Sequence, residues 1–181
     1  MTRDGFSRTA TADDAVSIAE LYVRTLRDAY ADQMPPDFVD PVDESERAAK
    51  IRNAINQRSR TYFVSVSGPA VVGFCALSTA RDQDLPPHFG EITVFGVHEA
   101  HRRQGHGRAL LECTRDEALR RNWHSLALWV VASNAAARAF YNHNGFRADG
   151  REKVDERLGF PASIVRYRLA LRRTDSEARP S

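Results

Sequence analysis

The stretch that decides the fold is VHEAHRRQGHGR, residues 97–108, which joins a β-rich run to an amphipathic helical pattern. Its two glycines, Gly105 and Gly107, permit positive φ angles and a close approach of the backbone to a ligand. The first N–H groups of the following helix lack intrahelical partners, and the helix dipole is positive at that end. Together with the three arginines of the stretch, this turn is suited to bind a pyrophosphate.

The turn differs from two common nucleotide-binding motifs. A dinucleotide fingerprint needs a third glycine where this chain has Leu110, and a P-loop needs a Gly-Lys-Ser/Thr sequence that is missing here. The glycine spacing by itself also fits an ordinary tight turn whose basic residues face solvent. Further motifs are therefore needed to assign a ligand.

The sequence on both sides of the turn predicts alternating helices and strands. Apolar residues at three- and four-residue spacing predict helices over residues 11–34, 45–58, 105–121 and 134–144. β-rich runs predict strands over residues 62–66, 71–77, 91–97, 126–132 and 165–171, with a short strand near residue 146. This order favours an α/β fold with one mixed sheet and helices on both faces.

The chain of 181 residues is long enough for one domain. We expect a flexible lead-in at residues 1–7, a single domain over residues 8–171 and a disordered tail at residues 172–181. The 26 basic and 24 acidic residues balance to +2, which favours neither nucleic acid nor a membrane as partner. No apolar run approaches a membrane span or a signal peptide. The two cysteines, Cys75 and Cys113, fit no metal or redox spacing, which favours a cytoplasmic location.

A second group of residues follows about 30 residues after the glycine turn. It consists of an expected helix N-cap, one helical face, a glycine suited to end the helix and an aromatic residue that can pack back on the domain. These positions are Asn134, Ala137, Phe140, Tyr141, Gly145 and Phe146.

With these two motifs the chain resembles the GNAT superfamily of acyl-CoA-dependent N-acetyltransferases over roughly residues 8–171. Residues 102–107 match the pyrophosphate loop of that superfamily, and residues 134–146 match its second motif. The resemblance implies a mostly antiparallel sheet with a splayed cofactor cleft. It also implies acetyl-CoA as co-substrate without a metal, and transfer of the acetyl group to an amine by direct attack in a ternary complex.

The resemblance assigns roles to individual residues. The backbone N–H around Val97 would polarise the thioester carbonyl, and Gly96 is suited to a bulge that exposes this N–H. Tyr141 would act as general acid for the leaving thiolate, and Asn134 would hold the pantetheine arm. The expected cofactor-binding residues are Phe95, Val97, Arg102, Arg103, Gln104, Gly105, His106, Gly107, Arg108, Asn134 and Arg138.

The base that removes a proton from the amine has two candidates. Glu91 precedes Val97 by six residues, so their side chains share one face of a regular strand unless a bulge intervenes. The alternative is ordered water, with Glu91 as an ordinary strand-edge carboxylate. The histidines at positions 98, 101 and 106 match no metal-ligand spacing and are expected to be polar residues on the cofactor side.

Acidic residues gather where the resemblance places the acceptor. They are Asp28, Asp32, Asp37, Asp40, Asp43 and Glu44, followed by Asp82 and Asp84 in a later loop. We expect a small-molecule amine acceptor, and an acidic rim would favour a cationic one; a solvated polar loop is the alternative interpretation. A protein N-terminal or lysine acetyltransferase and a non-catalytic acyl-CoA-binding module are alternatives, and both a monomer and a homodimer are open.

Overall fold

The computed structural model describes residues 7–32, 34–35, 43–157 and 159–171. Within these residues the strands are β1 (Ser7–Thr9), β2 (Thr61–Ser67), β3 (Ala70–Thr79), β4 (Phe89–Val97), β5 (Ser125–Val131), β6 (Arg147–Asp155) and β7 (Ala162–Ala170). The helices are α1 (Ala15–Ala29), α2 (Glu44–Asn56), α3 (His106–Arg120) and α4 (Ala135–His143), with short 3₁₀ turns η1 (Ala12–Asp14) and η2 (Glu99–His101).

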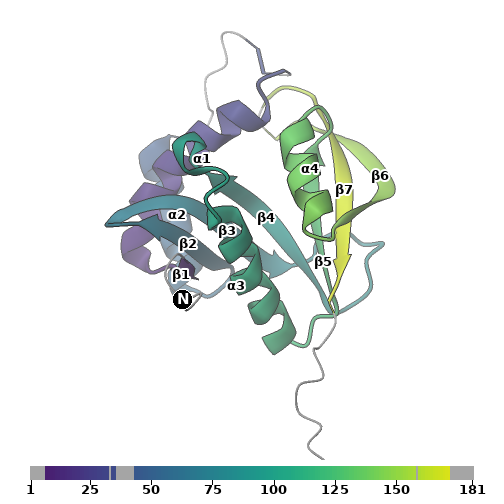
Figure 1. Ribbon diagram of the computed structural model, residues 1–181, viewed down its shortest axis with the longest axis horizontal. Helices are drawn as coiled ribbons and strands as arrows, with labels where there is room; N and C mark the ends of the chain where they lie inside the picture. The colour runs from purple at the N-terminus through teal and green to yellow at the C-terminus, as the bar shows by residue number, and fades with distance from the viewer. Residues whose placement is uncertain (1–6, 33, 36–42, 158, 172–181) are drawn as a thin grey trace, which may run out of the picture.

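The strands form one sheet in the order β1-β2-β3-β4-β5-β7-β6. Neighbouring strands run antiparallel except β4 and β5, which run parallel. Helices α3 and α4 cover one face of the sheet, and α1 and α2 lie behind the other (Figure 1). The fold is therefore the expected mixed, mostly antiparallel sheet with helices on both faces.

Each face of the sheet carries its own apolar core. Leu110 and Leu111 of α3 pack with residues of β5 and β7 on one face. Ile18 of α1 packs with Val64 and Phe74 on the other. Because both faces are buried, β3 and β5 read as nearly continuous apolar runs rather than alternating ones.

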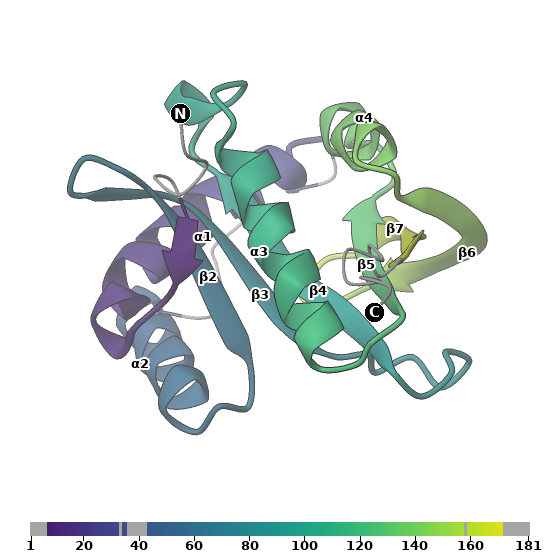
Figure 2. The same cartoon turned by 60° about the horizontal axis from the view of Figure 1, so that its bottom comes forward.

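The sheet opens between its two central strands. Strands β4 and β5 pair only from Phe89–Ile92 against Ser125–Leu128. Directly after the last pair, Ile92 stands opposite Leu77 and Val94 opposite Ala76, which leaves Thr93 as a bulge. A bulge bends its strand and increases the local twist, so it turns β4 away from β5. The two strands then diverge toward the ends that face α3 and α4 (Figure 2).

The predicted bulge at Gly96 is wrong, because Gly96 pairs regularly with Phe74. A Cβ at this position would lie 2.8 Å from the Phe74 ring and 2.8 Å from the Thr25 side chain. Gly96 is therefore required for the close approach of α1 to the sheet.

Several predicted helix ends are confirmed. Thr11 is three residues before Asp14, which is the capping-box spacing, and its N–H donates to the Asp14 carboxylate at 2.7 Å at the start of η1. The side chain of Asn134 caps α4 by accepting from the N–H of Ala137 at 2.9 Å. Gly145 follows α4 with a φ of 87°.

Other element boundaries differ from the predictions. Helix α1 ends at Ala29, earlier than the predicted stop before Pro35. The short strand expected near residue 146 is the nine-residue strand β6, and β1 begins at Ser7 inside the expected lead-in. Among the helices that the structure describes, none combines the length and apolar character of a membrane span.

Candidate active site

The register of β4 directs two backbone N–H groups into the gap between β4 and β5. Val97 stands opposite Gly73, and the next residue, His98, donates its N–H to the Val72 carbonyl at 2.8 Å. In an antiparallel ladder this bond marks Val97 and Gly73 as a pair that does not exchange hydrogen bonds. The N–H groups of Val97 and of Phe95, two residues earlier, therefore point away from β3 toward the open side.

The N-terminus of α3 provides a second set of backbone donors. Gly105 precedes the helix with a φ of 95°, and a Cβ placed there would meet no described atom within 4 Å. No side chain within the described segments caps this helix end. The first N–H groups of α3, those of residues 106–108, have no acceptor within the helix and lie at the positive end of the helix dipole. This arrangement fits the pyrophosphate of a nucleotide cofactor.

Gly107 is required for a different reason than Gly105. A Cβ at Gly107 would lie 3.1 Å from the Phe140 ring of α4 and 3.7 Å from Phe95 of β4. This glycine lets the first turn of α3 approach the rings at the mouth of the gap. The ring centroids of Phe95 and Phe140 lie 5.5 Å apart, so β4 and α4 contact each other beside the first turn of α3.

Most polar side chains of the glycine turn form hydrogen bonds or ion pairs with neighbouring residues. Arg102 donates to the Val97 carbonyl at 3.2 Å and pairs with Asp28 of α1 at 2.5 Å. Arg108 pairs with Glu112 along the helix. Gln104 donates to the Ala100 carbonyl, and Arg103, with a φ of 61°, is exposed. At this turn, backbone groups are thus better placed than most side chains to meet an anion.

Tyr141 lies where the gap and α4 meet. Its ring is 7% exposed and packs against Phe95, Phe146 and Tyr167. The residue lines the cleft, and its hydroxyl has no hydrogen-bond partner among the described residues. Burial raises the pKa of this phenol, so it stays protonated at neutral pH and can donate a proton.

The side chains of Asn134 and Arg138 form hydrogen bonds with residues close to them in the chain. The Asn134 carbonyl oxygen caps α4, while its amide group lies 3.5 Å from the Ala29 carbonyl across the cleft. Arg138 donates to the Ala132 carbonyl at 2.9 Å and to the Tyr167 hydroxyl at 3.2 Å. Arg138 therefore links the residue after β5 to β7, and its guanidinium group is already hydrogen-bonded within the protein.

Glu91 is tied to an arginine that the sequence did not single out. Arg81 donates to its carboxylate from Nε at 3.0 Å, from Nη2 at 2.7 Å and from the backbone N–H at 3.2 Å. The Glu91 side chain is 6% exposed and Arg81 is 51% exposed. The carboxylate thus lies beneath the guanidinium and is not open to a substrate amine in this arrangement.

The splayed strands enclose one large cleft. Its volume is about 810 Å³, and it lies between α1 and α2 on one side and β4, β5 and the β6–β7 end on the other. Phe95, Asn134 and Tyr141 line it. The cleft therefore connects the open backbone groups of β4 to a chamber that can hold a second molecule.

Comparison of the sequence with known families identifies the family of the chain. The model of the acetyltransferase (GNAT) family matches residues 18–146, more than two thirds of the chain. The chain belongs to the acetyltransferase (GNAT) family. It is also 25% identical over 127 residues, 70% of this chain and 72% of the relative, to the uncharacterized N-acetyltransferase YuaI of Bacillus subtilis (strain 168).

Solved structures share the fold of this GNAT protein. The putative acetyltransferase yncA from Salmonella typhimurium, solved with its cofactor acetyl-CoA, has a TM-score of 0.72 at 24% identity and covers 98% of this chain and 99% of its own. The ribosomal-protein-alanine N-acetyltransferase from Brucella melitensis has a TM-score of 0.71 at 24% identity and covers 91% and 99%.

His106 does not offer its side chain to the cofactor side of this GNAT protein. Its ring is 2% exposed and contacts the Ser65 hydroxyl of β2 at 2.8 Å. Burial lowers the pKa of the imidazole. The expectation of a cofactor-side ring at His106 is therefore wrong. The described residues contain no group of three His, Cys, Asp or Glu side chains that could hold a metal.

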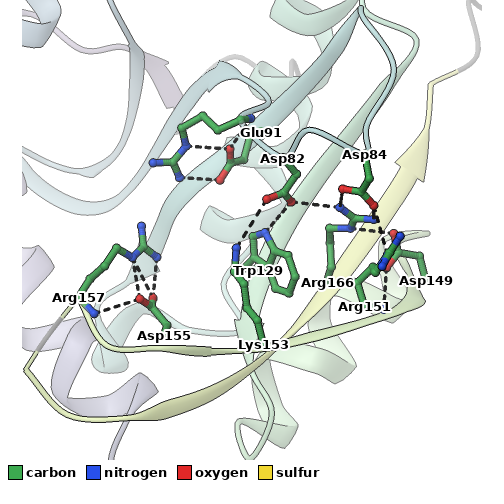
Figure 3. A network of polar contacts seen from close by, with 11 residues as sticks. Asp82, Asp84, Glu91, Trp129, Asp149, Arg151, Lys153, Asp155, Arg157 and Arg166 are labelled. Atoms are coloured by element: carbon green, nitrogen blue, oxygen red, sulfur yellow. Dashed lines mark hydrogen bonds and ion pairs between the residues drawn. The ribbon is translucent and has the colours of Figure 1, made fainter.

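Three residues of the expected acidic rim, Asp28, Asp82 and Asp84, are paired with arginines in the structure. Asp82 and Asp84 bind Arg166, which is 3% exposed, at 3.1 and 2.7 Å. Lys153 and the Trp129 indole also contact Asp82, and Arg151 contacts Asp84 (Figure 3). Of the earlier six carboxylates, Asp28 pairs with Arg102 and Asp43 caps α2; Asp37 and Asp40 lie outside the described residues.

Sequence reasoning missed Arg166. Its alternation with apolar neighbours is typical of a half-exposed strand, yet its side chain is buried among Asp82, Asp84 and Asp149. The available signal was the pair of aspartates in the β3–β4 loop, which needed a cation from elsewhere in the chain.

Proposed function

We propose that this protein transfers an acetyl group from acetyl-CoA to the amine of a small-molecule acceptor, by direct attack in a ternary complex. The observation that carries the proposal is the opening of the sheet at Thr93. It directs the Phe95 and Val97 backbone toward a cleft that also receives the Tyr141 hydroxyl. Membership of the acetyltransferase family supports the reaction type.

Binding of acetyl-CoA is assigned mainly to backbone groups. The N–H groups at the start of α3 hold the pyrophosphate, with Arg103 as the exposed cation of the turn. The N–H groups of Phe95 and Val97 hold the pantetheine arm and the thioester carbonyl, on which negative charge develops during attack. Bound there, acetyl-CoA supplies an activated acyl group. Arg102, Gln104 and Arg108 shape the turn, and Asn134 and Arg138 fix the start of α4 beside it.

Tyr141 is assigned as the general acid. Its buried, protonated hydroxyl has no competing partner among the described side chains, so it can donate to the thiolate that leaves as the amine attacks. Packing against Phe95 and Phe146 fixes the ring and therefore the position of the donor.

For the base, the ion pair of Glu91 with Arg81 favours the second of the two alternatives. The Glu91 carboxylate accepts three hydrogen bonds from Arg81 and is 6% exposed, so a substrate amine cannot approach it in this arrangement. We therefore assign proton removal to water in the cleft. The free cysteines Cys75 and Cys113 support the expected cytoplasmic location.

The test combines cofactor binding with one hydroxyl deletion. Calorimetry of the wild type should detect acetyl-CoA binding, and release of CoA should depend on an added amine. In Tyr141→Phe, kcat should fall by about 10²-fold, the usual range for a general acid, while acetyl-CoA affinity changes little. Thr114→Val, which removes a buried hydroxyl of α3 that does not line the cleft, is the control and should keep kcat.

Two outcomes would contradict the proposal. Absence of acetyl-CoA binding would exclude the reaction, and an unchanged kcat in Tyr141→Phe, when chemistry limits the rate, would remove Tyr141 from the mechanism. Acetylation of peptides in preference to every small amine would replace the small-molecule acceptor with a protein one.

A further inference from the structure

The charged residues of the cleft are opposite in sign to those expected from the sequence. Among the described residues that line it, the cationic side chains outnumber the anionic ones. The cations are Arg47, Lys50, Arg60, Arg81 and Arg157, and the anions are Glu91 and Asp155. Lys50 pairs with Glu46 on α2, and Arg47 lies over the Tyr22 ring at 4.1 Å. The other three arginines lie on other elements of the cleft wall.

Two of these arginines are held in the same way. Arg157 donates to Asp155 from Nε at 2.8 and 3.0 Å and from Nη2 at 2.6 Å, just as Arg81 donates to Glu91. Asp155 is 8% exposed while Arg157 is 66% exposed, so the carboxylate again lies beneath the guanidinium. In Figure 3, the carboxylates of Glu91 and Asp155 are each hydrogen-bonded to a guanidinium group on one side. Each buried acid orients an arginine that is open to the cleft.

Each of these guanidinium groups keeps unused donors. A guanidinium carries five N–H groups, and the pair with a carboxylate engages only Nε and Nη2. Neither Arg81 Nη1 nor Arg157 Nη1 has a hydrogen-bond partner among the described residues. Arg60, one residue before β2, likewise makes no ion pair within the described segments. The cleft wall thus presents oriented donors for which the described chain offers no acceptor.

Both arginines line the same cleft and add positive charge to it. Hydrogen bonds that Arg81 donates to Glu91 raise the pKa of Arg81, and the positive charge of Arg157 acts in the opposite direction. Tyr22 and Tyr30 of the α1 side line the same cleft. Two cations that repel each other in one chamber are stabilised by an anion that binds both.

We propose that the acceptor is an amine that also carries an oxyanion, such as a carboxylate or a phosphonate, and that Arg81 and Arg157 bind this group. The inference rests on the proposed acetyl transfer and identifies the substrate class of the same cleft. Arginine suits the task because its planar fork donates to oxyanions with defined geometry. Glu91 and Asp155 are then positioning residues, which hold the arginines with Nη1 toward the acceptor.

The same charges discriminate against the acceptor class first expected. A polyamine or aminoglycoside would bring several positive charges toward two guanidinium groups, and juxtaposed like charges oppose binding. An amine with one oxyanion would instead be oriented at one end by the arginines, leaving its amino group free for the β4 side of the cleft.

The experiment compares acceptors that differ in one charge. Common α-amino acids, β-alanine and γ-aminobutyrate are each assayed beside their carboxamides, with aminophosphonates, spermidine and an aminoglycoside as further arms. Release of CoA is measured, and acetyl-CoA affinity is measured separately by calorimetry. The best carboxylate or phosphonate should exceed its neutral partner at least tenfold in kcat/KM, and its KM should rise with salt.

Variants then assign the effect to residues. Arg81→Gln and Arg157→Gln should raise KM for the anionic acceptor about tenfold with a smaller change in kcat, and should leave KM for the carboxamide unchanged. Arg151→Gln is the matched control, because Arg151 lies on β6, is 63% exposed and does not line the cleft, and its partner Asp84 keeps the ion pair with Arg166. The double variant Arg157→Gln/Asp155→Asn removes the pair without leaving a buried charge, should the single variant fold poorly.

The outcomes separate this inference from the proposed function. Intact acetyl-CoA binding with carboxamides or polyamines as the best acceptors, or with no anionic acceptor used at all, would overturn the inference and leave acetyl transfer standing. A preference for the anion that persists in both arginine variants would also overturn it. Failure to bind acetyl-CoA would instead overturn the proposed function.

Discussion

The two halves of the cleft offer different kinds of hydrogen-bond donor for the ligands proposed above. The half proposed for the cofactor, called the cofactor half, presents main-chain N–H groups of β4 and of the first turn of α3, and its glycines keep side chains out of the way. The half proposed for the acceptor, called the acceptor half, presents the long side chains of Arg81 and Arg157, each paired with a buried carboxylate. Main-chain donors suit a ligand shared by a whole family, whereas a few side chains can be exchanged to suit one acceptor.

The difference extends to how each half is supported. Apolar packing of Gly107, Phe95 and Phe140 fixes the cofactor half. The acceptor half depends on ion pairs between the β3–β4 loop and the β6–β7 hairpin, centred on Arg166. The acceptor half should therefore respond to charge deletion and pH, and the cofactor half to added side-chain volume.

The largest expected effect comes from Arg166→Gln. The change removes a buried cation from three aspartates, and breaking a buried pair costs about 3–5 kcal/mol. Denaturant titration should show this loss in the free energy of unfolding, and acetyl-CoA affinity of the folded variant should be kept. Arg168→Gln is the control, because Arg168 is 40% exposed and lies 3.9 Å from Asp149, so its loss should cost less than about 1 kcal/mol. Equal losses in the two variants would refute the central place of Arg166.

Gly105→Val should act on the cofactor half alone. The new side chain occupies the open space beside the α3 N-terminus and strains a φ of 95°, so acetyl-CoA should bind at least tenfold more weakly, about 1.4 kcal/mol. Gly68→Val supplies the same kind of strain in the β2–β3 turn, where φ is 57° and space is also open. Calorimetry should show weaker binding only for Gly105→Val; equal affinities would mean that the glycine turn does not hold the pyrophosphate.

The smallest effect concerns acid stability in the acceptor half. Hydrogen bonds from Arg166 lower the pKa of Asp84 from 3.8 to about 2. A carboxyl whose folded pKa is depressed contributes stability above its unfolded pKa and loses that contribution as pH falls through the folded value. The wild-type melting temperature should therefore fall between about pH 4 and pH 2 more steeply than that of Asp84→Asn, while the two run parallel from pH 5 to pH 4. Identical slopes below pH 4 would show that the Arg166 pair does not govern acid unfolding.

Sequence reasoning recovered the features whose causes are local. The capping residues Thr11 and Asn134 and the positive φ of Gly105 follow from short-range geometry, and the structure has them where the spacing predicts. The alternation of helices and strands gave the mixed sheet in the same way. Predictions that depend on contacts between distant segments were wrong at two positions. The bulge lies at Thr93 and not at Gly96, and the His106 ring points inward to Ser65.

By itself, then, the sequence determined the alternating fold, the backbone donors at the glycine turn and the family to which they belong, because these depend on neighbours in the chain. Only the tertiary structure decided the charge of the acceptor half. Asp82 and Asp84 look like a free acidic rim until β7 brings Arg166 to them from 84 and 82 residues away. Arg81 looks like an ordinary loop residue until the fold places the Glu91 carboxylate beneath it. Charge pairing acts through space, so the sign of a cleft is fixed by which side chains the fold brings together.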